Sequence, residues 1–254
     1  MPKPSFPPLR AAFTPAKDLM PKYLNEILAR LEDHGAYTVI RGEGMCRLGP
    51  SMVNDGCPIA TAIRCRQGGI IIRPVRIVNG RVEGKGVEDV DSIVTGLAVH
   101  EKYIELVREA NPGWVLQADT YYTTYIDYAG SRLEVGFSPD ILIGRNGEWY
   151  LAEVKTSAPS TAHEIQLALY WWLLRDYYNI KRLYLITPDA IIGYRPESME
   201  GYAKQGIDYL FSVKRVLDSW PQDAERPNFI VKGPCPCRFA PACPVYKGLL
   251  AYTR

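Results

Sequence analysis

The sequence predicts an α/β protein, and the order of its apolar segments is the main reason. Short apolar runs separated by Asn-Gly turns are typical of strand pairs. Longer segments with apolar residues at helical spacing lie before, between and after these runs. Between residues 91 and 220 the order is helix, three strands, helix and strand. We therefore expect an α/β core formed by a mixed sheet flanked by helices.

The N-terminal part is expected to be less regular. Apolar residues at helical spacing predict a helix over 17–34, whereas 36–68 is expected to be irregular or weakly helical. The dipeptide Asn79-Gly80 lies between apolar runs and predicts a strand pair over 68–84.

In the rest of the chain, predicted helices and strands alternate. Apolar periodicity predicts a helix over 91–110, strands over 114–140 and a helix over 157–179. A short apolar run predicts a further strand over 182–190, and helical spacing returns over 196–219. The chain thus divides into a proline-rich arm (1–16), an N-terminal helical and basic segment with one cysteine of interest (17–90), the core (91–220) and a C-terminal cysteine tail (221–254).

The segment DILIGRNGEWYLAEVKT carries two acids and an amine in a strand pair that should be packing. Asn146-Gly147 predicts a two-residue type I′ turn, which needs positive φ at both central positions. Counting outward from this turn places Asp140 directly opposite Glu153, on the same face of the hairpin. Lys155 lies two residues beyond Glu153 and therefore shares that face.

Carboxylates that face each other repel, and such repulsion persists where a cation compensates it. Mg²⁺ and Mn²⁺ prefer carboxylate oxygens and keep open positions for water and phosphate. We therefore predict a divalent metal site at Asp140 and Glu153. The alternative is a surface ion cluster, which explains Lys155 beside Glu153 but not two acids facing each other among apolar residues. His100, on the preceding helix, is taken by itself as a structural histidine.

The helix that follows is predicted to pack near this acidic patch. Thr161 and Glu164 have the spacing of a capping box, which marks the helix start. Gln166 and Tyr170 are four residues apart and share one face, and His163 lies on the same stripe. Without the patch, they would be interpreted as a surface glutamine and a half-buried tyrosine.

Composition limits the classes of protein to which the chain can belong. Its 254 residues are 47% hydrophobic and 23% charged, which describes an ordinary globular protein with a sizeable core. No apolar run approaches the roughly 18–20 residues of a membrane span, and the proline-rich start has no signal-peptide core. We therefore expect a cytoplasmic protein without membrane contact. Residues 41–85 hold eight Arg or Lys against three acids, which fits a polyanion-binding surface or a solvated face.

The cysteines predict a metal or cluster site. Disulfides are disfavoured in the expected reducing compartment, and Cys235 and Cys237 are too close for an ordinary mutual bridge. Soft thiolates select iron–sulfur clusters or zinc, and both stay open at this point. The six cysteines are Cys46, Cys57, Cys65, Cys235, Cys237 and Cys243.

Four motifs occur in a fixed order, and together they resemble the RecB-like branch of the PD-(D/E)xK nucleases. They are a histidine, an acid after a proline, an E-x-K strand and a Q-x-x-x-Y helix. The chain departs from the family pattern at one glycine, because four positions rather than three separate Gly136 from the acid. In this sequence the motifs are His100, Pro139-Asp140, Glu153-Val154-Lys155 and Gln166 to Tyr170.

This resemblance, over residues 50–250, implies a restriction-endonuclease-like core and metal-dependent DNA cleavage. It implies that His100, Asp140, Glu153 and the Val154 carbonyl hold Mn²⁺ or Mg²⁺. The residues it places in catalysis are Asp140, Glu153, Lys155, Gln166 and Tyr170.

The cysteines resemble the iron–sulfur staple of some of these nucleases, which joins an N-terminal segment to the C-terminal tail. Cys57, which precedes a proline, matches the upstream ligand, and the C-terminal trio keeps the family's five-residue gap. One residue separates Cys235 from Cys237, where the family has two, so Cys46 or Cys65 can substitute for Cys235 as a ligand. The implied ligands of a 4Fe–4S or 2Fe–2S cluster, or of zinc as the alternative, are Cys57, Cys235, Cys237 and Cys243.

Staples of this kind occur in AddB-type repair nucleases and in the fourth CRISPR-associated family, an exonuclease of spacer acquisition. The small size and the lack of a Walker-type sequence favour the CRISPR-associated family. The implied partners are single-stranded DNA, the CRISPR integrase complex and further copies of this chain. A RecB- or AddB-like repair nuclease, and a non-catalytic DNA-binding subunit that retains the scaffold, are the alternatives.

Overall fold

The structure is a computed structural model, and it describes residues 3–9, 47–66, 76–78, 81–83, 90–118 and 120–219. The helix predicted over 17–34 lies outside the described residues. So do Cys46, the later part of the proline-rich arm and the cysteine tail over 221–254.

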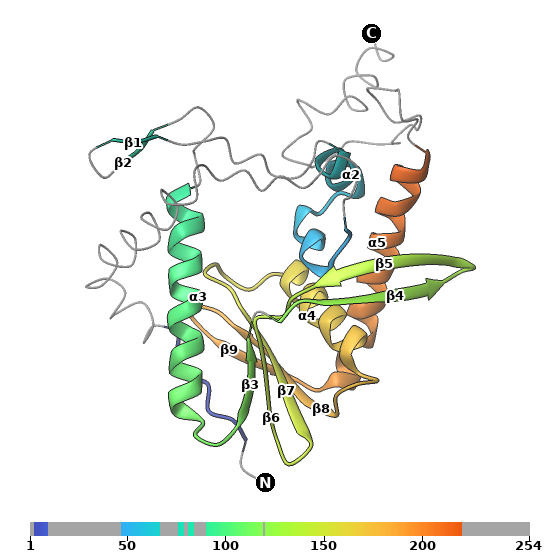
Figure 1. Cartoon of the computed structure of the whole chain (residues 1–254). Helices are drawn as coiled ribbons and strands as arrows, with labels where there is room; N and C mark the ends of the chain where they lie inside the picture. Colours follow the sequence, from blue (N-terminus) through green and yellow to red (C-terminus); the bar gives the residue numbers. More distant parts are fainter. Residues whose placement is uncertain are drawn as a thin grey trace.

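A five-stranded mixed sheet forms the centre of the described part (Figure 1). The strand order is β3-β6-β7-β8-β9, in which β7 and β8 are parallel and the other neighbours are antiparallel. The strands are β3 (Val115–Ala118), β6 (Ile141–Arg145), β7 (Glu148–Val154), β8 (Ile180–Ile186) and β9 (Ile191–Tyr194).

Helices cover both faces of this sheet (Figure 1). α4 (Thr161–Leu174) connects the parallel strands β7 and β8 and packs with α5 (Glu200–Ser219) on one face. α3 (Val90–Ala110) lies on the other. Neighbouring side chains on β6 alternate between the two layers, with Leu142 packing beside α4 and α5 and Ile143 beside α3. The expected α/β core, a mixed sheet flanked by helices, is therefore confirmed.

A separate two-stranded ribbon, formed by β4 (Tyr122–Tyr128) and β5 (Ser131–Phe137), projects from the sheet (Figure 1). It packs against α5, where the Tyr128 hydroxyl donates a hydrogen bond to Asp208 and its ring lies 5.3 Å from that of Phe211. β5 leads directly into β6, so the ribbon borders the beginning of that strand.

The remaining described elements are short. The 3₁₀ helix η1 (Pro50–Asp55) and α2 (Pro58–Arg66) lie in the segment expected to be irregular or weakly helical. β1 (Arg76–Val78) and β2 (Arg81–Glu83) form the antiparallel pair predicted around the first Asn-Gly dipeptide, and η2 (Pro196–Met199) precedes α5. No helix among the described residues is both long and apolar enough to cross a membrane.

The turn between β6 and β7 has the predicted form. Asn146 has φ of 55° and Gly147 has φ of 78°, so both central residues are in the left-handed region that a type I′ turn requires. The antiparallel register then runs from the turn to the start of β6. Asp140, the residue before β6, is therefore level with Glu153, as counting from the turn predicts.

The strand predicted over 182–190 is in fact a strand followed by a turn. β8 ends at Ile186, and the Thr187 amide donates to the Ala190 carbonyl at 2.8 Å, which returns the chain into β9. β9 was not predicted, because it is a short edge strand that contains a glycine and exposes Ile191.

The contact between α4 and α5 provides a first test of the fold. A Cβ added at Gly206 would lie 2.5 Å from Cγ of Leu169, whereas one added at Gly201 meets nothing within 4 Å. We expect Gly206→Ala to lower the free energy of unfolding by about 1–2 kcal/mol, because overpacking outweighs the gain in helix propensity. The control Gly201→Ala, on the same helix, is expected to raise it by up to about 1 kcal/mol. Urea unfolding measures both, and equal effects would contradict this packing.

Candidate active site

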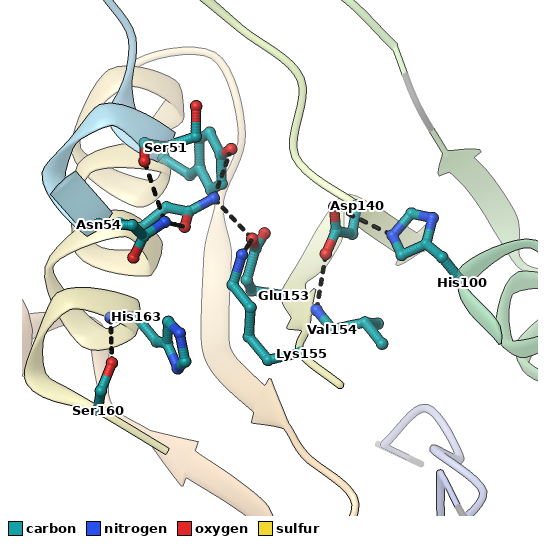
Figure 2. A network of polar contacts seen from close by, with 11 residues as sticks. Ser51, Asn54, His100, Asp140, Glu153, Val154, Lys155, Ser160 and His163 are labelled. Atoms are coloured by element: carbon teal, nitrogen blue, oxygen red, sulfur yellow. Dashed lines mark hydrogen bonds and ion pairs between the residues drawn. The ribbon is translucent and has the colours of Figure 1, made fainter. Parts of the chain in front are cut away.

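Two acids and a lysine meet at one end of the β6–β7 hairpin. Asp140 directly precedes β6, Glu153 is near the end of β7, and Lys155 follows that strand. Figure 2 shows Asp140, Glu153 and Lys155 close to one another. All three line a cleft of about 570 Å³. The structure therefore brings together the three side chains that the turn register predicts to share a face.

Asp140 uses both of its carboxylate oxygens (Figure 2). Its Oδ1 lies 3.0 Å from His100 Nε2, on α3. Its Oδ2 accepts a hydrogen bond from the Val154 amide at 2.7 Å, just beyond the last paired residues of β6 and β7. The carboxylate thus continues the strand pairing where the backbone ladder ends. The contact to Val154 is made by its amide, and a role for its carbonyl as a metal ligand stays a prediction.

Glu153 is the most deeply buried charged group of the cleft, with a relative exposure of 1%. Its Oε1 accepts from Lys155 Nζ at 2.7 Å and from Gln166 Nε2 at 2.6 Å. Its Oε2 is buried and has no hydrogen-bond partner among the described residues. When Glu153 is ionised, this oxygen can only accept, so a hydrogen-bond donor or a cation is needed to satisfy it. When the carboxyl is protonated, it can instead share its proton with Asp140.

The burial of this group changes the pKa values around it. Burial, and then repulsion from Asp140, raise the pKa of Glu153 from 4.5 to about 8. Burial lowers the pKa of Lys155, but attraction by Glu153 and Asp140 outweighs burial and raises it above its ordinary value. Burial followed by the two carboxylates raises the pKa of Tyr170 well above its ordinary value. The lysine therefore keeps its proton, and repulsion from Asp140 makes Glu153 retain its own proton to higher pH when no metal is bound.

Gln166 and Tyr170 face this patch from α4, as the predicted helix spacing requires. Gln166 Nε2 also donates to the Tyr170 hydroxyl at 2.9 Å, so one amide group joins the tyrosine to Glu153. Its Oε1 accepts from Asn54 Nδ2 at 2.7 Å, and this contact fixes which way the amide points. Asn54 belongs to η1 and was not predicted, because its partner is 112 positions away and no local pattern marks it.

The capping box predicted at Thr161 does not form, and α4, predicted over 157–179, spans Thr161–Leu174. Ser160, rather than Thr161, is the N-cap, and its hydroxyl accepts from the His163 amide at 3.3 Å. Glu164 instead accepts a hydrogen bond from the Tyr194 hydroxyl of β9 at 2.8 Å. Adjacent hydroxyl residues have the same capping chemistry, so sequence alone does not separate them. Burial and the nearby Lys155 lower the pKa of His163.

The predicted metal ligands remain predictions, and their positions can be described in the structure. Asp140 contacts His100, and Glu153 lies in the same cleft. Within the described ranges, however, no three His, Cys, Asp or Glu side chains gather closely enough to form a ready-made metal-binding group. One oxygen of Glu153 contacts Lys155, and one oxygen of Asp140 accepts from the Val154 amide. The ligand set stays a prediction.

The two described cysteines lie at either end of α2. Cys57 precedes this helix and Cys65 is near its end, and both are half-buried against the main hydrophobic core. Cys65 is disulfide-bonded, which differs from the expectation that disulfides are disfavoured. The predicted ligands Cys235, Cys237 and Cys243 lie outside the described residues.

Two further residues line the cleft and were not singled out by the sequence. Tyr121 lies between β3 and β4, and Arg47 precedes η1. The excess of basic residues over 41–85 was the only signal that included Arg47. Tyr121 lies in a tyrosine-rich run that alternation alone assigns to a strand.

No protein-family model matches the chain, and no curated protein matches it. The crystal structure of SSO0001 is similar, with 19% identity and a TM-score of 0.41 over 90% of this chain and 97% of that chain. We draw no conclusion about fold or function from a likeness at this TM-score.

The raised pKa of Glu153 predicts how stability depends on pH without metal. Between pH 4.5 and about 8 the folded state holds a proton that the unfolded state has lost, so stability falls as pH rises through this window. Glu153→Gln removes the titrating group and is expected to flatten that fall. Urea unfolding in EDTA at pH 5 and pH 8 measures the difference between the two proteins.

A matched control is Glu197→Gln, which changes an exposed acid of η2 and should behave like the wild type. If the wild type and Glu153→Gln lose the same stability between pH 5 and pH 8, the carboxyl is not protonated in the folded protein.

Proposed function

We propose that the protein is a metal-dependent deoxyribonuclease, an exonuclease that acts on single-stranded DNA ends. The observation that carries this proposal is the buried Glu153 carboxylate beside Asp140. One oxygen accepts from Lys155 and Gln166, whereas the other faces no hydrogen-bond donor in the described part of the chain once Glu153 is ionised. A divalent cation satisfies such an oxygen and removes the repulsion between the acids. The mixed sheet flanked by helices is compatible with the restriction-endonuclease-like core that the motifs imply.

The donor set suits a hard cation. Asp140 and Glu153 offer carboxylate oxygens, and His100 and the Val154 carbonyl complete the proposed ligands of one or two Mg²⁺ or Mn²⁺ ions. When bound, such an ion polarises the phosphate and lowers the pKa of water, which gives a nucleophile near neutral pH. Hydrolysis joins a water oxygen to phosphorus and breaks one P–O bond of the strand.

The other side chains act through position and charge. Lys155 keeps its ammonium, which orients the attacking water or stabilises negative charge on the phosphorane-like transition state. Gln166, held by Asn54, keeps Glu153 in place through a 2.6 Å hydrogen bond. The Tyr170 hydroxyl, 2.9 Å from the same amide, steadies this arrangement from the helix side.

We further propose that the cysteines hold an iron–sulfur cluster with a structural role, using Cys57, Cys235, Cys237 and Cys243. The cluster would join the segment before α2 to the tail and would take no part in electron transfer. The support is that the cysteine spacing resembles that of the family. Cys57 also follows Asn54 by three residues, so a cluster held there would anchor the segment that contacts Gln166. The same resemblance suggests that the products serve CRISPR spacer acquisition.

Lys155→Ala tests the site. We expect it to keep the fold and to reduce Mn²⁺-dependent cleavage of a labelled single strand by at least about a hundredfold, because a charge aimed at the reacting phosphate is lost. Lys204→Ala, which removes an exposed lysine of α5, is the matched control and should cleave like the wild type.

Circular dichroism checks the fold of both variants, and EDTA should abolish cleavage by the wild type. If Lys155→Ala cleaves as fast as the wild type in Mn²⁺, the site assignment fails. A wild-type protein that binds the strand but never cleaves it would instead be a non-catalytic DNA-binding subunit.

Cys243→Ala tests the cluster. We expect anaerobically purified variant to lose the brown colour, the iron and the sulfide of the wild type, and to melt at a lower temperature, because a cross-link that closes a long loop is lost. Lys204→Ala, which changes an exposed residue of α5 outside the proposed ligand set, is the control and should keep the colour. Absorption spectra with iron, sulfide and zinc analyses decide the result, and a colourless wild type that contains zinc would establish the zinc alternative.

A further inference from the structure

Tyr121 is a large aromatic side chain left open at the edge of the cleft. It is 57% exposed and lines the same cleft as Asp140, Glu153 and Lys155. Tyr125 and Tyr177 are also exposed, at 57% and 74%, but neither lines the cleft. Tyr121 is therefore set apart by its position rather than by its exposure.

The ring of Tyr121 is held in place by its neighbours. It lies across Gly136 of β5, where an added Cβ would be 2.0 Å from the Tyr121 hydroxyl oxygen and 2.9 Å from the ring carbon that bears it. Only glycine leaves room for the ring at this point. The Tyr121 hydroxyl also shares a side-chain hydrogen bond with Arg47. A ring fixed at its hydroxyl end and open elsewhere presents a surface on which a flat group can stack.

Arg47 adds a positive charge to the same edge of the cleft. Its guanidinium forms an ion pair with Glu134 at 3.5 Å, and the two side chains are 51% and 40% exposed. An exposed pair of this kind contributes little to stability, so a phosphate can replace the carboxylate at low cost. Guanidinium is also the side-chain group best suited to bind phosphate through two hydrogen bonds.

The proposed catalytic side chains and the pair formed by Arg47 and Tyr121 therefore occupy different parts of the cleft. The two carboxylates and Lys155 form the more buried part of its lining, and we call the more exposed pair, Arg47 and Tyr121, its rim. A DNA strand has the matching chemistry, because each nucleotide offers a flat base to an aromatic ring and a phosphate to a cation.

We propose that Tyr121 and Arg47 form a binding subsite for one unpaired nucleotide next to the bond that is cleaved. The Tyr121 ring stacks on the base, and the Arg47 guanidinium contacts a flanking phosphate. This subsite rests on the proposed nuclease function, because it places the strand over Glu153 and Lys155. It selects single strands, since a base paired within a duplex does not offer its face to the ring.

The experiment measures binding in the Lys155→Ala background, so that cleavage does not interfere. A short fluorescein-labelled oligothymidylate is titrated with protein by fluorescence anisotropy. We expect Tyr121→Leu to raise Kd by about tenfold or more, because one base loses its stacking partner. Tyr121→Phe keeps the ring, and its Kd should stay within about threefold of the parent value. A change of this size is smaller than the loss of one stacking contact. Tyr177→Leu, in the turn that follows α4, is the matched control and should not change Kd.

A second series tests stacking at a single nucleotide. Abasic sites are placed one at a time along the oligonucleotide, and we expect one position to weaken binding to the parent protein. At that position the abasic site should have no further effect on Tyr121→Leu, because the same contact is already lost. A surface tyrosine with only a structural role would not produce this position-specific loss.

The outcomes separate the subsite from the proposed function. If Lys155→Ala abolishes Mn²⁺-dependent cleavage but Tyr121→Leu binds and responds to abasic sites like its parent, the subsite is wrong and the nuclease stands. If the wild type neither binds nor cleaves the oligonucleotide, both proposals fail. If Tyr177→Leu weakens binding as much as Tyr121→Leu, the effect is not specific to the cleft and the subsite is rejected.

Discussion

Burial of the Glu153 carboxylate is the constraint on which the arrangement of the cleft depends. β7 has strands at both edges and helices over both faces, so a charged side chain near its end has almost no access to water. Lys155 and Gln166 both satisfy one oxygen, and Asn54 holds the glutamine. Under the proposed function, an ion shared with Asp140 satisfies the other. The free-energy cost of placing two acids together in the cleft is then offset by binding of the ion.

The parts of this arrangement that follow from local rules were predictable from the sequence. An Asn-Gly turn requires positive φ at two residues, and the period of two along a strand carries its register outward. This is why the proximity of Asp140, Glu153 and Lys155 was predicted without a structure. Helical spacing likewise predicted a shared face for Gln166 and Tyr170, whose side chains are in fact joined by a hydrogen bond.

The rest depends on contacts between distant segments, which no periodicity or turn rule describes. Asn54 reaches Gln166 across 112 positions, and the rim of the cleft combines Arg47 with Tyr121 from separate parts of the chain. The missed strand β9 has a different cause, because a short edge strand has little alternation of apolar and polar residues. Where local chemistry is the same at two positions, as at the start of α4, tertiary packing decides between them.

The segment over 47–57 gives the cleft a wall that does not belong to the sheet. One of its carbonyls accepts a hydrogen bond from the Gly136 amide at 3.0 Å, and a Cβ on Gly49 would lie 2.4 Å from the Gly136 carbonyl oxygen. The rim arginine and Asn54 therefore lie on one short segment that is docked against β5. Under the proposed function, Cys57 ties that segment to the cluster. The cluster then acts on catalysis through position, because it holds the wall that carries the arginine and fixes the glutamine of α4.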